Sequence, residues 1–307
     1  MRRFQPFSVR AHAKVNLSLR VLDARPDGYH DLETVFQALA LHDTLDVEPH
    51  KGRLELSCDM PGVPLDENNL AWRAATLVWR CSGRSGEPGG VRLHLRKRIP
   101  AQGGLGGGSS NAAAALVGLA GLWLPGADLA ILHDLGASIG ADVPFFLCGG
   151  TALGLHRGNR VFPLADLPAW HVVLVFPPFG VSTPAAYGWL DEAREAGGIS
   201  PGGYGQLQLA GGVAIDVRND LEMPVVRRHP QIGQLRNALV ALGAEGAAMS
   251  GSGSTVFGLY SSRDRAASAA AALRREGWQT LVTRTASRRQ SSLPGPLVVR
   301  TRFSRID

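Results

Sequence analysis

A glycine-rich segment near the middle of the chain has the sequence Gly103-Gly104-Leu105-Gly106-Gly107-Gly108-Ser109-Ser110-Asn111-Ala112-Ala113, with five glycines in six positions. Glycine lets backbone N–H groups turn into a loop without obstruction from Cβ atoms. The alanine-rich run that follows predicts a helix over about 112–124, whose first turn offers unpaired N–H groups and the positive end of its dipole. No acidic residue between Glu87 and Asp128 competes for that end. The segment therefore predicts an anion-binding loop, most often one for phosphate.

This glycine loop, residues 103–110, matches neither common nucleotide-binding pattern. A Walker loop needs Lys and then Ser or Thr after its last glycine, but Gly108 is followed directly by Ser109. The dinucleotide pattern needs a third glycine three residues after Gly106, where this chain has Ser109. A flexible linker is the structural alternative, but a strand-like run precedes the loop and an apolar helix follows it. We therefore expect a nucleotide loop that takes its positive charge from elsewhere.

Length and residue patterning predict an α+β protein of two domains. A chain of 307 residues is too long for one small core, and its second half alternates strand and helix patterns. We place the first domain at residues 1–164, the second at 165–285 and a basic tail at 286–307. In the first half, strands are expected over residues 8–21, 33–47 and 91–99, and helices over 69–81 and 128–139.

Net charge, hydropathy and cysteine count predict a cytoplasmic protein with reduced thiols. The net charge is +6, and much of the excess lies in arginines near the C-terminus among Ser, Pro and Gly, which predicts a solvated basic tail. No apolar run is long enough to cross a bilayer, and the N-terminus lacks a signal-peptide core, so a cytoplasmic protein is expected. The odd number of cysteines, Cys58, Cys81 and Cys148, predicts reduced thiols and argues against a disulfide framework or a zinc site.

Lysine is scarce, so each lysine invites an explanation. Only Lys14, Lys51 and Lys97 occur among 32 basic residues, and a retained lysine can mark a place where a compact ammonium must fit. Phosphoryl transfer needs a cation near the phosphates and a carboxylate to accept the hydroxyl proton. Lys14 and Asp142 are candidates for these roles. Lys14 could equally be a surface charge, and Asp142, two residues before Pro144, could equally cap a helix.

At this point four segments carry a resemblance to a known family. Residues Pro100 to Ala113 resemble the phosphate loop of the GHMP small-molecule kinases. Three further segments agree with that family in chain order, and they are Ala13-Lys14-Val15-Asn16-Leu17, Asp27-Gly28-Tyr29-His30 and Gly140-Ala141-Asp142-Val143-Pro144-Phe145-Phe146. The segment Gly251-Ser252-Gly253-Ser254 is similar to the family's third glycine motif. The resemblance covers nearly the whole chain except the tail.

The resemblance implies a fold and a reaction. The implied fold is the two-domain α+β GHMP kinase fold, with a ribosomal-S5-domain-2-like N-terminal domain and a ferredoxin-like C-terminal domain. The implied reaction transfers a phosphoryl group from ATP to a small alcohol. Asp142 matches the family's catalytic base, and Lys14 matches the residue that orients this carboxylate. The expanded form of the loop points to the branch whose alcohol carries a cytidine diphosphate group.

Binding residues follow from the same resemblance, position by position. Asn16 and His30 match residues that hold the substrate, with His30 facing the cytosine edge, and Tyr29 matches an aromatic that stacks on the cytosine. Tyr187 is our choice for the second stacking aromatic, although a half-buried helix residue is an equal alternative. Asn69 and Lys97 match contacts to adenine and ribose. The implied ATP-binding residues are Asn69, Lys97, Pro100, Gly103, Gly104, Leu105, Gly106, Gly107, Gly108, Ser109, Ser110 and Asn111.

Two features depart from the family pattern or stay unassigned. The loop usually begins Pro-Met-Gly-Gly, whereas this chain has Pro100-Ala101-Gln102-Gly103, which affects fine positioning more than phosphate binding. Mg²⁺ should accompany ATP, and Ser109 or Ser110 could ligate it, but helix capping is an equally good use of either hydroxyl. The metal ligands are therefore left unassigned.

Two other functions remain open from the sequence. A GHMP kinase for another alcohol, such as homoserine or mevalonate, would keep the loop without needing Tyr29 and His30. In a different class, a nucleotide-dependent protein could bind RNA through the basic tail, although no aromatic residues interleave with its arginines. The kinase interpretation expects a small-molecule substrate, no nucleic acid, no membrane partner, and a monomer or weak homodimer.

Overall fold

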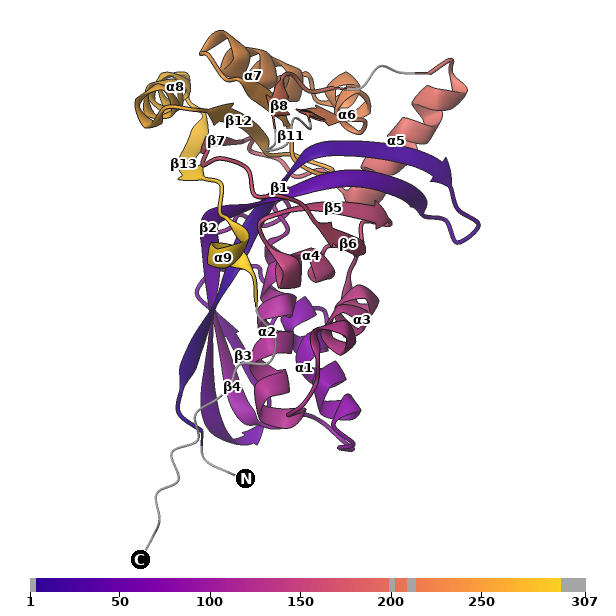
Figure 1. Ribbon diagram of the computed structural model, residues 1–307, viewed down its shortest axis with the longest axis vertical. Coiled ribbons are helices and arrows are strands. Elements are labelled where there is room, and N and C mark those ends of the chain that lie inside the picture. The colour runs from indigo at the N-terminus through magenta and orange to yellow at the C-terminus, as the bar shows by residue number, and fades with distance from the viewer. Residues whose placement is uncertain (1–3, 199–201, 209–213, 294–307) are drawn as a thin grey trace, which may run out of the picture.

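The structure is a computed structural model that describes residues 4–198, 202–208 and 214–293. Figure 1 shows an elongated molecule, with one layer of helices packed on a sheet in its lower half and a second helix-on-sheet unit at its upper end. Within the described ranges, no helix combines the length and hydropathy that a bilayer crossing requires. The three cysteines are free thiols, as the sequence predicts.

The lower sheet is organised around two very long strands. The strands β1 (Phe7–Ala24) and β2 (His30–Arg53) pair antiparallel over most of their length, with register shifts near Lys14 and Asn16. The strand path is β10-β1-β2-β4-β3, and β5 also pairs with β2 and carries β6. The remaining strands of this sheet are β3 (Glu55–Cys58), β4 (Gly89–Arg96), β5 (Thr151–His156), β6 (Arg160–Pro163) and β10 (Arg218–Asn219).

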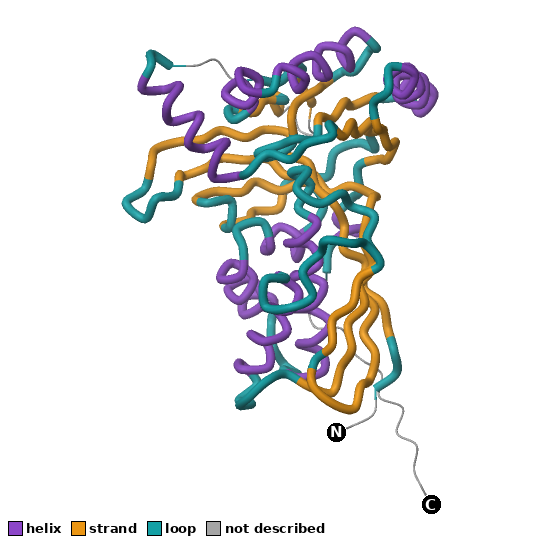
Figure 2. Tube along the Cα trace, turned by 180° about the vertical axis from the view of Figure 1, so that it is seen from behind, coloured by secondary structure: helices purple, strands orange, loops and turns teal. Residues whose placement is uncertain are grey.

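Four helices cover one face of this sheet, as Figure 2 shows from behind. They are α1 (Leu70–Cys81), α2 (Gly107–Trp123), α3 (Leu129–Ile139) and α4 (Val143–Cys148). From Ser110 onward almost every residue of α2 is buried, because its small alanines let neighbouring elements pack against it on all sides. This central helix starts five residues before the expected Ala112, inside the glycine run itself. The glycine loop is therefore partly the first turn of α2.

The upper unit has a four-stranded antiparallel sheet in the order β11-β12-β7-β13. This strand order, with helices on one side, is the expected ferredoxin-like arrangement. Its strands are β7 (His171–Phe176), β11 (Gly246–Met249), β12 (Val256–Tyr260) and β13 (Gln279–Arg284). Its helices are α5 (Thr183–Glu195), α6 (Glu222–Arg228), α7 (Pro230–Ala241) and α8 (Arg263–Arg275). A small two-stranded sheet joins β8 (Gln206–Gln208) to β9 (Ala214–Asp216).

The two units share structure across the expected boundary at residue 164. Strand β10 belongs to the second half of the chain but pairs in parallel with β1, with Leu19 opposite Asn219. Leu19 and Val21 of β1 are in turn buried in the core of the upper unit. The long β1–β2 arm therefore runs beneath the second domain, with its free end close to α5 (Figure 1).

The prediction of a solvated basic tail from residue 286 is wrong for its first eight residues. The helix α9 (Arg288–Ser291) packs on the lower unit, and Ala286 and Leu293 are part of that unit's core. The guanidinium of Arg288 donates to the carbonyls of Thr151 and Leu164 at 2.9 and 2.8 Å. These carbonyls lie at the start of β5 and just after β6, so Arg288 ties the C-terminal segment to this hairpin. Residues 294–307 lie outside the described residues.

Candidate active site

Lys14 and Asp142 meet, although 128 positions separate them in the chain. The ammonium of Lys14 lies 3.3 Å from Oδ2 of Asp142 and donates to Oδ1 of Asn16 at 2.6 Å. Lys14 is 3% exposed, so it is not a surface charge. The Asp142 side chain is 31% exposed and can be reached by a substrate. A buried cation thus holds a carboxylate that a reacting hydroxyl can reach, which is the placement a general base needs.

Asp142 occupies the N-cap position of α4 but does not act as a cap. Its backbone is helical, and its side chain makes no capping hydrogen bond to α4. The capping alternative that the sequence left open is therefore not what the structure shows. The carboxylate faces Lys14 and the β5–β6 turn, where a Cβ on Gly158 would lie 4.0 Å from Oδ1 of Asp142.

The glycine loop lies against Lys14 and the third glycine motif. The backbone N–H of Lys14 donates to the carbonyl of Leu105 at 3.0 Å. Gly104 and Gly106 have φ angles of +72° and +70°, in the region that favours glycine. A Cβ on Gly104 would come within 2.0 Å of the carbonyl oxygen of Ser250. The two glycine segments therefore pack backbone against backbone, which no larger residue would permit.

The first turn of α2 is open at its positive end, as the sequence predicts. It contains no acidic residue and no side-chain cap, because the N-cap position is Gly106. Neither Ser109 nor Ser110 is a cap, since both lie inside the helix. Helix N–H groups and the glycine backbone thus remain for an anionic ligand.

The residues around Asp142 fit a Mg²⁺ ion carried mainly by phosphates. The hydroxyl of Ser110 is fully buried without a hydrogen-bond partner, and Ser109 Oγ lies 3.8 Å from where a Cβ on Gly140 would be. Among the described residues, no cluster of three His, Cys, Asp or Glu side chains could hold a metal alone. Mg²⁺ commonly binds through one or two carboxylates together with substrate phosphates, so Asp142 and these hydroxyls would suit such an ion.

Asn69 and Lys97 are engaged by the protein itself. Asn69 caps α1, accepting from the N–H of Ala71 at 2.9 Å, while its amide donates to the carbonyl of Pro64 at 2.7 Å. The ammonium of Lys97 is bound to Asp43 and donates to Oδ1 of Asn111 at 3.0 Å. Their matches to adenine and ribose contacts stay predictions. Pro100 is half-buried at the entry to the loop.

The substrate-side residues gather where the β1–β2 arm passes α5. The rings of His30 and Tyr187 stack with centroids 5.3 Å apart and an interplanar angle of 24°. Nε2 of His30 lies 2.8 Å from Oδ1 of Asp191. Burial raises the pKa of the Tyr187 hydroxyl, and the nearby negative charge of Asp142 raises it further. Tyr187 therefore lies close to the Lys14–Asp142 pair.

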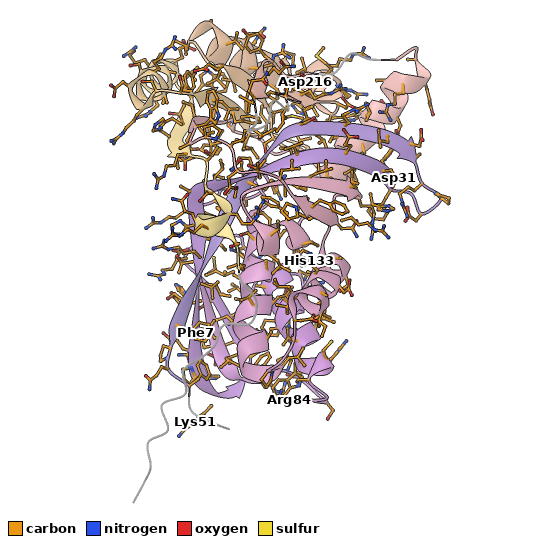
Figure 3. The ribbon with its side chains drawn as sticks, viewed as in Figure 1. Phe7, Asp31, Lys51, Arg84, His133 and Asp216 are labelled. Carbon is orange, nitrogen blue, oxygen red and sulfur yellow. The ribbon has the colours of Figure 1, made fainter. Side chains whose placement is uncertain are left out.

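Tyr29 stands apart from this stack. It is 56% exposed, and the guanidinium of Arg157 lies over its ring at 4.7 Å. Asp31, two residues further along, lies near the tip of the arm in Figure 3. An exposed ring backed by a cation leaves its other face for a planar ligand.

Sequence reasoning missed three residues that support this site. Asp191 fixes His30, and Thr34 accepts from the amide of Asn16 at 2.8 Å. Asp191 follows Tyr187 by four positions, so helical spacing placed both on one face of α5. Asp43 is fully buried beside Lys97, and no sequence signal singled it out, because β2 carries other carboxylates such as Asp46 and Glu48.

Family models and known proteins match most of the chain. The model of the GHMP kinases N terminal domain matches residues 69–150, and the model of the GHMP kinases C terminal domain matches residues 209–279. A 4-diphosphocytidyl-2-C-methyl-D-erythritol kinase of Pelotomaculum thermopropionicum is 42% identical over 283 residues, which cover 90% of this chain and 96% of the relative. The chain belongs to the GHMP kinase family.

Two further relatives extend this GHMP kinase assignment over nearly the full chain. A protein of the same name from Nocardia farcinica is 42% identical over 306 residues, covering 96% of each chain. A crystal structure of a 4-(cytidine 5'-diphospho)-2C-methyl-D-erythritol kinase is 38% identical, with a TM-score of 0.71 over 92% of this chain and 100% of that chain. The expected two-domain α+β GHMP kinase fold is thus confirmed.

Proposed function

We propose that this GHMP kinase transfers the γ-phosphoryl group of ATP to the 2-hydroxyl of 4-diphosphocytidyl-2-C-methyl-D-erythritol, giving the 2-phosphate and ADP. This reaction belongs to the non-mevalonate (MEP) route to isoprenoid precursors. The observation that carries the proposal is the Asp142 carboxylate, which lies 3.3 Å from the ammonium of Lys14, a residue whose backbone N–H donates to Leu105 of the glycine loop. The names of relatives at up to 42% identity support the same substrate.

Asp142 and Lys14 divide the chemistry between them. Asp142 accepts the proton of the 2-hydroxyl as the oxygen forms its bond to the γ-phosphorus, and the bond between that phosphorus and the β–γ bridging oxygen breaks. Lys14 holds the carboxylate in place and offsets negative charge that develops nearby. The transfer is direct and in line, because one base and one cation suffice without a covalent enzyme intermediate.

The glycine loop and α2 supply the phosphate site. Backbone N–H groups of residues 103–110 and the positive end of α2 bind the triphosphate. Asp142 and the hydroxyl of Ser109 or Ser110 would help to hold Mg²⁺ together with the phosphates, and the ion would supply further charge neutralisation. The protein's net charge of +6 suits two polyanionic substrates.

The aromatic residues select the cytidine end of the substrate. Tyr29 and Tyr187 offer ring faces to the cytosine, and His30 offers a polar edge whose orientation Asp191 fixes through a 2.8 Å contact. Asn16 holds the alcohol end. Its own amide is held in place by Lys14, which donates to its oxygen, and by Thr34, which accepts from its nitrogen. A cytoplasmic location, a monomer or weak homodimer and the absence of a nucleic-acid partner stay predictions.

The decisive experiment measures ADP release with the diphosphocytidyl substrate. The variant Asp142→Asn should lose at least several hundredfold in kcat per folded molecule, at the strong end of general-base contributions. Asp134→Asn, an exposed aspartate of α3 without an ion-pair partner among the described residues, is the matched control. Wild-type activity in Asp142→Asn would remove Asp142 as the base.

Competition by CDP separates the proposal from a kinase for homoserine or mevalonate. A cytosine pocket predicts that millimolar CDP inhibits competitively against the alcohol substrate and not against ATP. Insensitivity of turnover to CDP would mean that Tyr29, His30 and Tyr187 do not form such a pocket.

A further inference from the structure

A buried carboxylate, Asp43, lies beside the glycine loop and has no role in the reaction described above. Its side chain is 0% exposed. Oδ1 accepts the backbone N–H groups of Arg98 and Ile99 at 2.6 and 2.8 Å. Oδ2 accepts the amide of Asn111 at 3.0 Å and also binds the ammonium of Lys97. Four donors therefore converge on one carboxylate.

These four donors come from both ends of the glycine loop. Arg98 and Ile99 directly precede Pro100, where the chain enters the loop, and Asn111 is the fifth residue of α2, where the loop has become helix. Asp43 itself is on β2. One side chain of the sheet thus fixes the separation and orientation of the two chain segments that bracket the phosphate site.

Lys97 is the fourth donor of this cluster, and its ammonium lies next to the first turn of α2. Its side chain is 5% exposed, and its Nζ lies 3.3 Å from where a Cβ on Gly107 would be. The ammonium is thus fixed under the first residue of the helix. To reach a nucleotide it would have to leave both Asp43 and Asn111, and a buried carboxylate without its cation is costly.

We propose that Asp43 is a positioning residue for the nucleotide site, and that Lys97 acts through Asp43 instead of contacting adenine or ribose. The carboxylate sets the shape of the glycine loop before ATP arrives, so that its N–H groups are already aimed at the phosphates. This inference rests on the proposed function only in taking the glycine loop as the ATP site.

The test is a double-mutant cycle on nucleotide binding. The variants Asp43→Asn, Lys97→Met and the combined pair are titrated calorimetrically with a non-hydrolysable ATP analogue. Each single variant should bind about tenfold or more weakly, because small displacements of a positioned group have effects of this size. The pair should bind no more weakly than the worse single variant, since the two residues act as one unit. The KM for the diphosphocytidyl alcohol should stay within about twofold.

A control and a milder variant guard against loss of folding. Asp46→Asn alters another aspartate of β2, whose partners are Ser8 and Arg96, and should leave nucleotide binding unchanged. Asn111→Ala removes a single donor from Asp43 and should weaken binding in the same direction if Asp43→Asn does not fold.

Three results would overturn the inference. Unchanged affinity in Asp43→Asn alongside weakened affinity in Lys97→Met would make Lys97 a direct ligand. Fully additive losses in the pair would make the two residues independent. Lower melting temperatures with unchanged nucleotide affinity would make the cluster merely structural. A wild type that binds the analogue but releases no ADP with the diphosphocytidyl alcohol would refute the proposed function and leave this inference standing.

Discussion

Lys14 illustrates how a single side chain acquires its role from its surroundings. An ammonium that is 3% exposed needs compensation, and it finds it in the carboxylate of Asp142 and the carbonyl oxygen of the Asn16 amide. Lys14 also lies 5.6 Å from the centre of the Phe36 ring, which adds a weaker favourable contact. The ion pair that stabilises this buried charge also holds the partly exposed Asp142 carboxylate in place.

Tyr187 is predicted to act through its ring and not through its hydroxyl. Burial raises the pKa of this hydroxyl, so it stays neutral where the enzyme works and cannot serve as a base. Tyr187→Phe should keep kcat and both KM values within about threefold, whereas Tyr187→Ala should raise the KM for the cytidine substrate about tenfold or more, as loss of base stacking does. Tyr204→Ala, an exposed tyrosine of the second domain, is the control in steady-state kinetics. Equal losses in the Phe and Ala variants would contradict this.

His12 is predicted to make the fold sensitive to mild acid. Burial lowers the pKa of its imidazole from the ordinary value of 6.5, so below about pH 6.5 the unfolded chain binds a proton that the native chain does not. The free energy of unfolding should therefore fall as pH drops, by at most about 1.4 kcal/mol per pH unit. Urea unfolding at pH 7.5 and 5.5 measures this loss.

The variant His12→Asn tests whether His12 is the group responsible. Its amide can replace the 2.8 Å hydrogen bond from Nδ1 to the carbonyl of Leu39 but cannot titrate. The acid-dependent loss should be smaller in this variant, and an identical loss would assign the effect to other groups.

At the scale of elements, the sequence predicted the position of α2 but placed the start of the helix too late. Glycine lowers helix propensity, so the run was expected to stay a loop until Ala112. In the structure the helix begins at Gly107, because the buried helix from Ser110 onward extends back through a turn that local propensity disfavours. The earlier start places more helix N–H groups at the phosphate site.

The contact between the two glycine segments gives a prediction at this scale. In Gly104→Ala the new Cβ would lie 2.0 Å from the carbonyl oxygen of Ser250, at a φ angle of +72°, so one segment must move. We expect kcat/KM for ATP to fall at least tenfold while circular dichroism still shows a folded protein. Gly188→Ala, at a helical glycine with open space around it, should leave activity unchanged and raise stability slightly. Normal kinetics in Gly104→Ala would show that the loop adapts without cost.

At the scale of the whole molecule, the last described residues pack on the first domain. After β13 in the upper unit, residues 286–293 cross to the lower unit, where Ala286 donates to Ala38 at 2.8 Å and Leu293 to Leu147 at 3.2 Å. Leu147 is in α4, the helix that begins beside Asp142. This C-terminal segment thus holds the far end of the helix that begins at the proposed catalytic carboxylate.

Two truncations are predicted to differ sharply. A chain ending at residue 293 keeps this C-terminal segment, whereas one ending at 285 loses the Arg288 hydrogen bonds and the apolar contacts of Ala286 and Leu293. We expect the shorter chain to lose at least about 2 kcal/mol of unfolding free energy relative to the longer one, seen calorimetrically, together with part of its kcat. Equal melting temperatures would show that residues 286–293 contribute nothing.

The amino-acid sequence by itself determined the position of the glycine-rich loop, the acid-free start of its helix, the family, and the α+β class, because each rests on local residue types and their spacing. Only the tertiary structure decided that Asp142 faces Lys14 instead of capping α4, that Lys97 is bound to Asp43, and that residues 286–293 pack on the first domain. The physical reason is that these facts depend on which distant segments meet, and a charge or an arginine has the same local pattern whether its partner is water or a buried carboxylate or carbonyl.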